Sequence, residues 1–184
     1  MKIIQTDIDG LLVIKPDIYG DERGYFFESF RQEWFDKEGI DVNFIQDNQS
    51  SSSYGVVRGL HMQNFPYQQA KLVRVIKGNV LDVAVDLRKD SSTYGKHFAI
   101  ELSDENNLQF FIPKGFAHGF AVLSKNAVFA YKCDEYYHPE SEIGIKWNDK
   151  DLNIDWKIDI NDLVISPKDQ KNKSFAEVMS NLSR

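Results

Sequence analysis

The chain has 184 residues, 42% of them hydrophobic and 13% aromatic, which suits one folded domain over residues 1–184 with a substantial core. Its formal net charge of −6 excludes a general nucleic-acid surface, which needs clustered basic residues. No apolar run approaches the roughly 18 residues of a membrane span, and acids interrupt the first ten residues where a secretory signal would be apolar. A single cysteine, Cys133, cannot form an internal disulfide, so we expect a packed thiol in a cytoplasmic protein. Neither nucleic acid nor membrane is expected as a partner.

The first 28 residues are expected to be mostly extended. Residues 3–14 are interrupted by the turn-forming pair Asp9-Gly10, which predicts two extended pieces. Pro16 then opens a loop, and Gly24 provides a bend before a short strand at 25–28.

A short helix is predicted to follow. Ser29 and Gln32 have the spacing of a capping box, and Gly39 stands where a helix stops. Its aromatic side chains indicate a packing helix and not a binding site. Residues 41–48 are expected to be extended again, and the four serines at 50–53 predict a flexible loop.

The middle of the chain is the most strand-like. Apolar residues alternate with other residues between 81 and 88, after a turn at Lys77-Gly78-Asn79. Two strands joined by a turn are predicted within 54–75, and further strands follow the turn at 77–79, span 97–102 and occur at least twice between 108 and 137. About ten short strands separated by turns indicate an all-β antiparallel sandwich or barrel of the jelly-roll kind.

The last part of the chain is expected to be mainly irregular. The acidic segment at 147–156 predicts a loop with short extended pieces. A final helix is predicted to begin at Ser174, which has Glu177 three residues later in the capping-box position. This C-terminal helix would pack through its apolar face.

His61 lies near the middle of a stretch that reads as two strands joined by a turn. In an extended chain alternate residues face the same way, so Gly59, His61 and Gln63 share one face while Leu60 and Met62 point to the other. One face is therefore apolar and the other is polar. Taken alone, His61 is equally consistent with an ordinary histidine on a solvated strand face.

Five blocks of sequence carry a family resemblance. They read RGLHMQ at 58–63, QAKLVRVIKGNVLDVAVDLR at 69–88, IPKGFAHGF at 112–120, YKCDEYYHPESEIGIKWND at 131–149 and SPKD at 166–169. In this order they resemble the dTDP-4-dehydrorhamnose 3,5-epimerase family over almost the whole chain. The resemblance implies a cupin-type jelly roll, a homodimer, and a cofactor-free epimerase that acts on a dTDP-4-keto-6-deoxy sugar in dTDP-L-rhamnose biosynthesis.

Inverting a carbon next to a ketone requires a base, a group that holds the enolate oxygen, and an acid on the opposite face. Histidine suits the first role because its ordinary pKa of about 6.5 leaves a neutral base near pH 7. The resemblance implies that His61 is the base, that Asp169 lies against it, that Lys71 holds the oxygen at C4, and that Tyr131 is the acid. A phenol keeps its proton at neutral pH and can release it to a strongly basic carbon.

The resemblance also implies a set of substrate-binding residues. They are Arg23, Glu28, Gln46, Asp47, Asn48, Arg58, His118, Tyr137, Glu142 and Lys168. Arg23, Arg58 and Lys168 would bind the diphosphate, for which the planar fork of arginine is well suited. Tyr137 would stack on the thymine, and the segment around Arg23 and Glu28 would reach into the site of the neighbouring subunit.

A metal site is not predicted. Many cupins bind a metal through a His-x-His pair followed by a glutamate and a later histidine. Here Gln63 stands two residues after His61, and His97 and His138 have no ligand-like spacing. The sequence therefore favours a reaction that uses side chains alone.

Two other functions remain open. Relatives with the same fold invert only one of the two carbons, and the loop NFPYQQ at 64–69 departs from the proline-rich loop common in the family. A non-catalytic protein that binds a sugar nucleotide is the other alternative, although a binder needs neither a base nor an acid. Isotope exchange at two carbons, one or none distinguishes the three.

Overall fold

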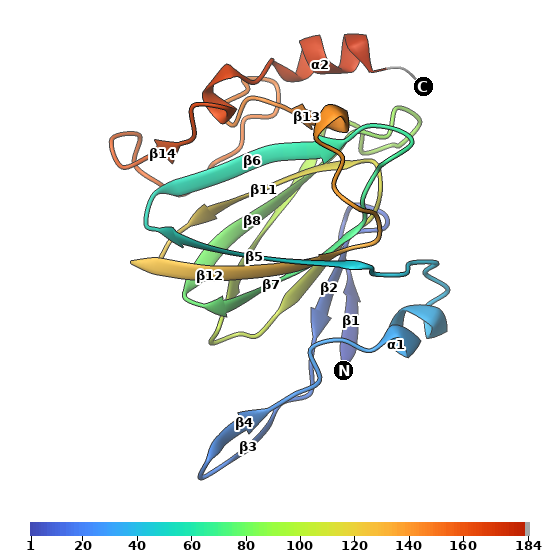
Figure 1. The fold of residues 1–184 in the computed structure, drawn as a ribbon, viewed down its shortest axis with the longest axis vertical. Coiled ribbons are helices and arrows are strands. Elements are labelled where there is room, and N and C mark those ends of the chain that lie inside the picture. The colour runs from blue at the N-terminus through green and yellow to red at the C-terminus, as the bar shows by residue number, and fades with distance from the viewer. Residues whose placement is uncertain (183–184) are drawn as a thin grey trace.

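The computed structural model describes residues 1–182, most of which form two β-sheets packed face to face (Figure 1). The first sheet contains β1 (Lys2–Gln5), β2 (Leu12–Lys15), β5 (Gln46–Ser53), β7 (Lys71–Lys77), β10 (Gln109–Ile112) and β12 (Asn126–Cys133). The second contains β6 (Val56–Gln63), β8 (Asn79–Asp86), β9 (His97–Ser103), β11 (Phe116–Val122), β13 (Glu142–Gly144) and β14 (Val164–Ile165). All pairs are antiparallel except β14 with β6, so the predicted all-β jelly roll is confirmed.

Strand order explains how distant segments meet. The first sheet has the order β1-β2-β10-β7-β12-β5, and the second has β13-β6-β11-β8-β9 with β14 also beside β6. The turn predicted at Lys77-Gly78-Asn79 is present, and it carries the chain from β7 in one sheet to β8 in the other. Strands β6 and β12, which are far apart in the sequence, therefore belong to opposite walls of one sandwich.

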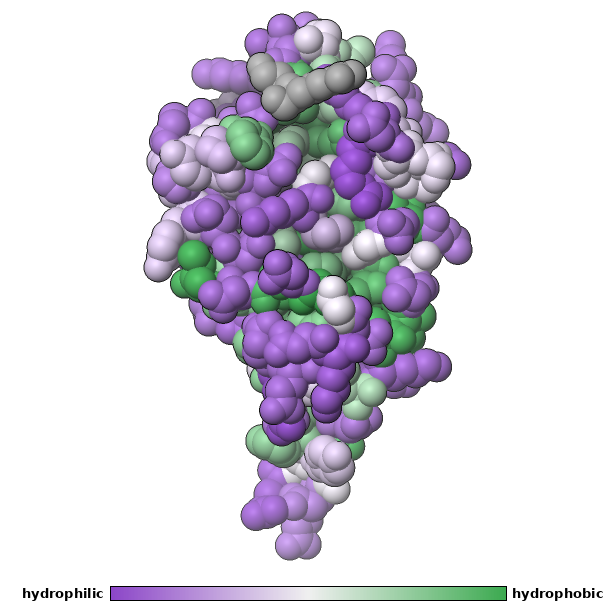
Figure 2. Space-filling view, turned by 90° about the vertical axis from the view of Figure 1, so that its right-hand side faces the viewer, coloured by the Kyte–Doolittle hydropathy of each residue, from purple (hydrophilic) through white to green (hydrophobic). Residues whose placement is uncertain are grey.

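The remaining elements lie around the sandwich. They are β3 (Tyr19–Asp21), β4 (Gly24–Phe26), α1 (Gln32–Lys37), the two short 3₁₀ helices η1 (Pro139–Ser141) and η2 (Asp169–Lys171), and α2 (Phe175–Asn181). Strands β3 and β4 form a hairpin that projects away from the body (Figure 1), and Figure 2 shows it as a narrow tail. Helix α2 lies over the second sheet (Figure 1). Among residues 1–182 no helix has the length and apolar character needed to cross a membrane.

The main core fills the space between the two sheets. It is mainly aliphatic with four phenylalanines, of which Phe120 and Phe129 stack with centroids 4.2 Å apart. A second cluster lies on the outer face of the second sheet, where Leu81 and Val83 of β8 meet Trp156 and the α2 residue Val178. Strand β8 is thus buried on both faces, because the C-terminal segment covers the face that a plain two-sheet sandwich leaves to solvent.

Helix α2 confirms its predicted start. The Ser174 hydroxyl accepts a hydrogen bond from the backbone N–H of Glu177, and the Glu177 carboxylate accepts one from the Ser174 N–H in return. Both halves of the capping box are present, so two of the free N–H groups at the helix start are satisfied.

The capping box predicted for the first helix is wrong. Helix α1 begins at Gln32 after Arg31, whose side chain makes no capping hydrogen bond. The carbonyl of Ser29 instead accepts a hydrogen bond from the amide of Gln109, which keeps this part of the chain against the first sheet. The predicted end near Gly39 is confirmed. A hydrogen bond from the Gln109 side chain to the Ser29 backbone is therefore present here, and the predicted capping bond is not.

The loop predicted at the four serines is also wrong. Residues 50–53 lie within β5, whose whole length pairs with β12 from Gln46↔Cys133 to Ser53↔Asn126. The region after Pro16, expected to be a loop, forms the β3–β4 hairpin. Serine is a weak strand former by itself, but pairing with an apolar neighbour strand satisfies its backbone groups and decides the conformation.

Gly59 is placed where only glycine fits. Its φ is +126°, and a Cβ on it would come within 2.6 Å of the Cα of Gly119 and 2.8 Å of the His118 carbonyl oxygen. We expect Gly59→Ala to lower the free energy of unfolding by roughly 2–5 kcal/mol, since a left-handed backbone penalty and an overpacking penalty add. Denaturant unfolding followed by circular dichroism measures this loss.

Gly24 is a matched control because it has the same φ of +126° but no atom within 4 Å of its ideal Cβ position. Gly24→Ala therefore reports the backbone penalty alone, which we expect to lower the free energy of unfolding by roughly 1–3 kcal/mol. Equal losses for the two variants would contradict a role for the tight approach of β6 to β11.

Candidate active site

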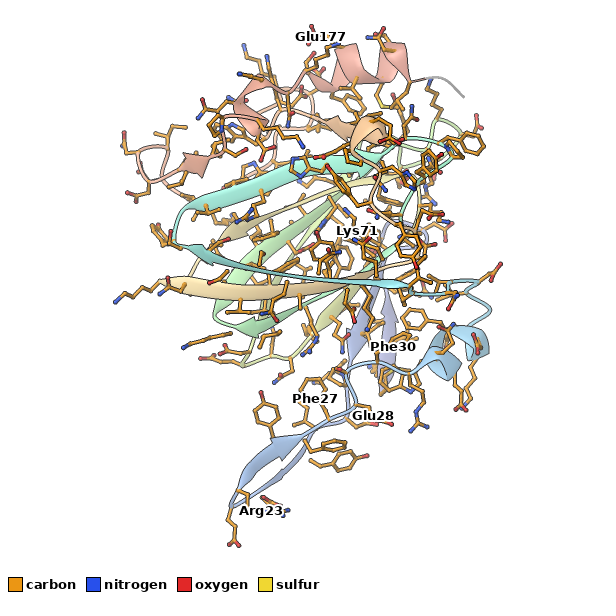
Figure 3. The ribbon with its side chains drawn as sticks, in the orientation of Figure 1. Arg23, Phe27, Glu28, Phe30, Lys71 and Glu177 are labelled. Carbon is orange, nitrogen blue, oxygen red and sulfur yellow. The ribbon has the colours of Figure 1, made fainter. Side chains whose placement is uncertain are left out.

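A cavity of about 670 Å³ opens between the two sheets. Its walls come from β5, β6, β7, β11 and β12 together with residues 164–169, and Figure 3 places Lys71 in the middle of the strands. This volume is in the range of a site for a medium-sized organic ligand. Polar side chains of its lining that the sequence predicted are Asn48, Arg58, His61, Lys71, His118, Tyr131, Lys168 and Asp169.

His61 and Asp169 form a close pair. The Nε2 atom of His61 lies 2.6 Å from Oδ1 of Asp169, whose side chain is only 4% exposed. Burial raises the pKa of Asp169, but the hydrogen bond and charge of His61, together with hydrogen bonds from Gly59 and Ser166, hold that pKa below its ordinary value overall. An ionised Asp169 accepts the Nε2–H, so the lone pair of the neutral ring is on Nδ1. The pair therefore presents a base of fixed tautomer.

Residues around Asp169 hold it in place. Its backbone N–H donates to the Ser166 hydroxyl at 3.0 Å, at the start of η2. Strand β14 delivers this segment beside β6 by parallel pairing of Val164 with Val56 and Ile165 with Val57. His61 and Asp169, which are 108 positions apart in the sequence, are thus brought together by a short parallel pairing next to the site.

Lys71 is the first residue of β7, and its half-buried side chain lines the cavity. Its Nζ lies 5.9 Å from the ring centroid of Tyr131. Burial lowers the pKa of Lys71, and the acidic groups Cys133, Asp82 and Glu142 act in the opposite direction. A half-buried ammonium is a strong hydrogen-bond donor because less water competes for it.

Tyr131 faces His61 across the cavity. It lies on β12 in the first sheet, whereas His61 lies on β6 in the second, and both side chains line the same cavity. Burial raises the pKa of Tyr131, so its hydroxyl keeps its proton at neutral pH. A basic group and an acidic group thus approach the cavity from opposite walls.

Three predicted binding residues form a connected group beside the cavity. The Tyr137 hydroxyl donates to Glu142, and Lys168 Nζ lies 2.6 Å from Oε2 of the same carboxylate. Burial raises the pKa of Glu142, but its bonds to Lys168 and Tyr137 outweigh this and lower it overall. Glu142 Oε1 also lies 4.0 Å from His61 Nε2, so this group adjoins the base.

The side chain of Gln46 links this group to the cavity. Its side-chain oxygen accepts a hydrogen bond from the Tyr137 N–H at 3.0 Å, and its nitrogen donates to Asn48 at 3.1 Å. Gln46 therefore orients Tyr137 and Asn48, and only Asn48 of these three lines the cavity itself.

Arg23, Glu28 and Asp47 do not line the cavity of their own chain. Arg23 lies at the tip of the projecting hairpin and pairs with Asp21, while Glu28 lies at its base and pairs with Arg31 (Figure 3). The Asp47 carboxylate is exposed and bonded to Lys132 at 2.9 Å, outside the sandwich interior. Any contact these residues make with a ligand must involve another copy of the chain or another surface.

The sequence prediction missed one residue near the site, Asp82 of β8. Its side chain is fully buried and lies 3.0 Å from Nε2 of His118, a cavity residue. An acid within an otherwise apolar strand was the available signal, but alternation alone suggested a solvated face. The predicted burial of Cys133 is confirmed, and burial raises its pKa to about 11.

Gln63, which stands where many cupins have a second metal ligand, has a different task. Its side-chain nitrogen donates to the carbonyls of Tyr67 and Tyr136, and its oxygen accepts from the His138 N–H. It ties together the two loops beside the cavity. Within residues 1–182 no three His, Cys, Asp or Glu side chains are grouped so as to hold a metal ion.

The sequence of this chain was compared with known protein families, known proteins and solved structures. A profile of the dTDP-4-dehydrorhamnose 3,5-epimerase family matches residues 5–177. The dTDP-4-dehydrorhamnose 3,5-epimerase of Methanothermobacter thermautotrophicus is 52% identical over 177 residues, covering 96% of this chain and 95% of the relative. The Escherichia coli enzyme of the same name is 51% identical over 180 residues, covering 97% of each chain.

A solved structure agrees in shape as well as in sequence. The dTDP-6-deoxy-D-glucose-3,5-epimerase of Legionella pneumophila, crystallised with dTDP-4-keto-L-rhamnose, superposes with a TM-score of 0.92 at 50% identity. The match covers 99% of this chain and 94% of that one. The likeness thus extends over both sheets and the segments that build the cavity.

Proposed function

Because the chain belongs to the dTDP-4-dehydrorhamnose 3,5-epimerase family, we propose that its cavity performs this reaction with His61 as base, Lys71 as oxyanion holder and Tyr131 as acid. The substrate is dTDP-4-dehydro-6-deoxy-D-glucose, and inversion of C3 and C5 gives dTDP-4-dehydro-L-rhamnose. The observation that carries the residue roles is the position of His61 and Tyr131 on opposite walls of one cavity.

The first step is removal of a proton from the carbon next to the C4 ketone. The lone pair on Nδ1 of His61 takes this proton, and the electron pair of the broken C–H bond moves onto the C4 oxygen. His61 becomes an imidazolium, which the ionised carboxylate of Asp169 stabilises at 2.6 Å. A positioned base of this kind contributes roughly 10²–10⁴ in rate.

The enolate oxygen formed in this step needs a donor. Lys71 lines the same cavity and is half-buried, so its charge is screened less than that of an exposed lysine. One such donor supplies roughly 3 kcal/mol of transition-state stabilisation. His118 lines the same cavity and would contribute to binding the sugar.

The second step returns a proton to the opposite face. The Tyr131 O–H bond breaks, its proton goes to the enolate carbon, and the electron pair of the enolate forms the new C–H bond. The raised pKa of Tyr131 makes its phenolate a good acceptor, so the tyrosine regains a proton from solvent or from the imidazolium before the next inversion. The balance requires no oxidant or reductant.

The nucleotide end of the substrate fits the group beside the cavity. Lys168 and Arg58 supply positive charge for the diphosphate, and Tyr137, whose ring is half exposed, offers a face for the thymine. Lys168 donates a hydrogen bond to the Glu142 carboxylate, so a diphosphate has to compete with this carboxylate for Lys168. This competition favours a dianionic ligand over a neutral sugar.

We further propose that two copies of the chain assemble with each β3–β4 hairpin at the neighbour's site. The hairpin carries exposed aromatic side chains, with Tyr25 60% and Phe26 66% exposed, and Arg23 at its tip. Exposed rings on a projecting arm are typical of a surface that another chain covers. Light scattering tests this assembly, since it should give twice the chain mass of 21.3 kDa.

Incubating dTDP-4-dehydro-6-deoxy-D-glucose with the protein in deuterated water tests the function. We expect deuterium to enter both C3 and C5, because one base and one acid reach both carbons. Proton NMR of the sugar measures this exchange. Exchange at one carbon alone would assign a single-centre epimerase. Tight binding of dTDP without exchange at either carbon would assign a non-catalytic binder and overturn the proposal.

A further inference from the structure

Tyr137, the residue assigned to the thymine, lies in a stretch without regular secondary structure. Residues 134–138 connect the end of β12 to η1, and they belong to neither a helix nor a strand. Tyr137 is half exposed, so packing alone does not fix its ring. Stacking requires a defined ring plane, and the backbone that carries the ring has to be held by other groups.

The side chain of Gln63 holds this backbone on both sides of Tyr137. Gln63 is buried at the end of β6. Its Nε2 donates to the carbonyl of Tyr136 at 3.1 Å, and its Oε1 accepts from the N–H of His138 at 2.6 Å. The N–H of Tyr137 itself donates to the side chain of Gln46 at 3.0 Å. Two glutamine side chains therefore take the place of a sheet or helix partner for these three residues.

The remaining donor of the Gln63 amide reaches the second loop beside the cavity. Nε2 also donates to the carbonyl of Tyr67 at 2.9 Å, and the ring of Tyr67 stacks on that of His138 with centroids 3.6 Å apart. The amide thus uses both of its N–H groups and its oxygen. Glutamate would lack the two donors and methionine would lack all three bonds. Among side chains of this length, only glutamine satisfies these backbone groups together.

We propose that Gln63 is a positioning residue for the nucleotide end of the substrate, because its amide fixes the ring of Tyr137 for stacking on the thymine. This role rests on the proposed function, in which Tyr137 binds the nucleobase. Gln63 follows His61 by two residues on β6. One strand therefore holds the residue that removes the proton and the segment that binds the thymine in fixed register.

The diphosphate is bound by other groups, which do not use the Gln63 side chain. Lys168 is bonded to Glu142 at 2.6 Å, and Glu142 is placed by the antiparallel pairing of β13 with β6. That pairing uses main-chain groups, which a change of the residue 63 side chain leaves in place. Loss of the Gln63 amide should therefore weaken binding of the nucleobase and spare binding of the diphosphate.

Gln63→Met keeps the length of the side chain and removes its hydrogen bonds. We expect KM for the dTDP-sugar and the inhibition constant of dTDP both to rise by about tenfold or more, the scale of one lost base–aromatic stack. We expect kcat for deuterium exchange, and the inhibition constant of inorganic diphosphate, to change by less than about threefold. An unchanged KM, or equal weakening of dTDP and diphosphate, contradicts the proposal.

A double-mutant cycle with Tyr137→Ala tests whether Gln63 acts through Tyr137. If it does, adding Gln63→Met to Tyr137→Ala should weaken dTDP binding by less than about twofold further, because the ring to be positioned is already absent. A full second loss would show that Gln63 acts by another route and would refute the assignment. Failure of the proposed function is distinct, since Tyr137→Ala alone would then leave dTDP binding unchanged.

Gln32→Met is the matched control for the substitution. Gln32 also donates from its side chain to a backbone carbonyl, that of Val42 at 2.7 Å, but it lies on α1 and does not line the cavity. Its variant should keep the wild-type KM and the wild-type inhibition constant of dTDP. A rise in KM equal to that of Gln63→Met would assign both effects to general loss of stability and not to positioning.

Hydrogen exchange in the wild-type protein provides a measurement that does not depend on the folding of a variant. NMR follows the side-chain amide protons of Gln63, with their signals assigned in the wild-type chain. Both protons are donated to carbonyls in a buried place, so we expect them to exchange at least about tenfold more slowly than those of the exposed Gln5. Exchange as fast as that of Gln5 would remove the basis of the proposal.

Discussion

Substituting His61 with asparagine is expected to reduce deuterium exchange at both C3 and C5 by roughly 10²–10⁴, the usual worth of a positioned base. Both carbons should be affected together, because we assign His61, bonded to Asp169 at 2.6 Å, as the base for both inversions. Asparagine leaves a polar partner near Asp169 and so limits the penalty of an unpaired buried carboxylate. Proton NMR of the sugar in deuterated water measures the exchange.

His97→Asn is the control for this substitution. His97 lies on β9 and does not line the cavity, so its variant should exchange deuterium at the wild-type rate. Should the His61 variant still exchange one of the two carbons normally, a second base would exist and the assignment of both steps to His61 would be wrong.

Tyr131→Phe is expected to separate exchange from inversion. Without the phenol the base can still remove a proton, and the imidazolium returns a deuteron to the face it came from. The recovered sugar should therefore contain deuterium with its original configuration, while inversion falls by roughly 10²–10⁴. Mass spectrometry gives the deuterium content, and the ring coupling constants in the NMR spectrum give the configuration.

A tyrosine away from the cavity controls for the change in side chain. Tyr94 packs against Phe175 of α2 with ring centroids 5.6 Å apart, and Tyr94→Phe should leave both exchange and inversion unchanged. Inversion at the wild-type rate in Tyr131→Phe would assign the acid to another group. Loss of exchange together with inversion would show that the tyrosine is needed for the first step as well.

The parts of the fold that could be predicted from sequence are those decided locally. Leu60 and Met62 join the outer apolar cluster while His61 lines the cavity, as alternation predicts, and α2 starts after Ser174 because the capping box satisfies its first N–H groups within the helix itself. The serines at 50–53 were misjudged because their conformation is decided by a partner strand some 75 residues later in the chain. Pairing across such a separation leaves no mark in the local sequence.

The site divides in the same way. A family resemblance indicated His61, Lys71, Tyr131 and Asp169, and the fold places all four around one cavity. Asp82 escaped notice because it reads as one member of an alternating strand, and only the cover provided by the C-terminal segment reveals that both faces of β8 are buried. Arg23 could not be located from sequence alone, since its hairpin projects away from its own sandwich (Figure 3).

His61 and Tyr131 belong to different sheets. The gap that a sugar ring must fit is therefore set by the distance between the two sheets. That spacing is maintained by aromatic packing next to the cavity, where Phe120 of β11 stacks on Phe129 of β12 at 4.2 Å. The two stacked rings set the distance between the sheets that carry His61 and Tyr131. Stereochemical outcome is therefore coupled to the volume of side chains that never meet the carbons being inverted.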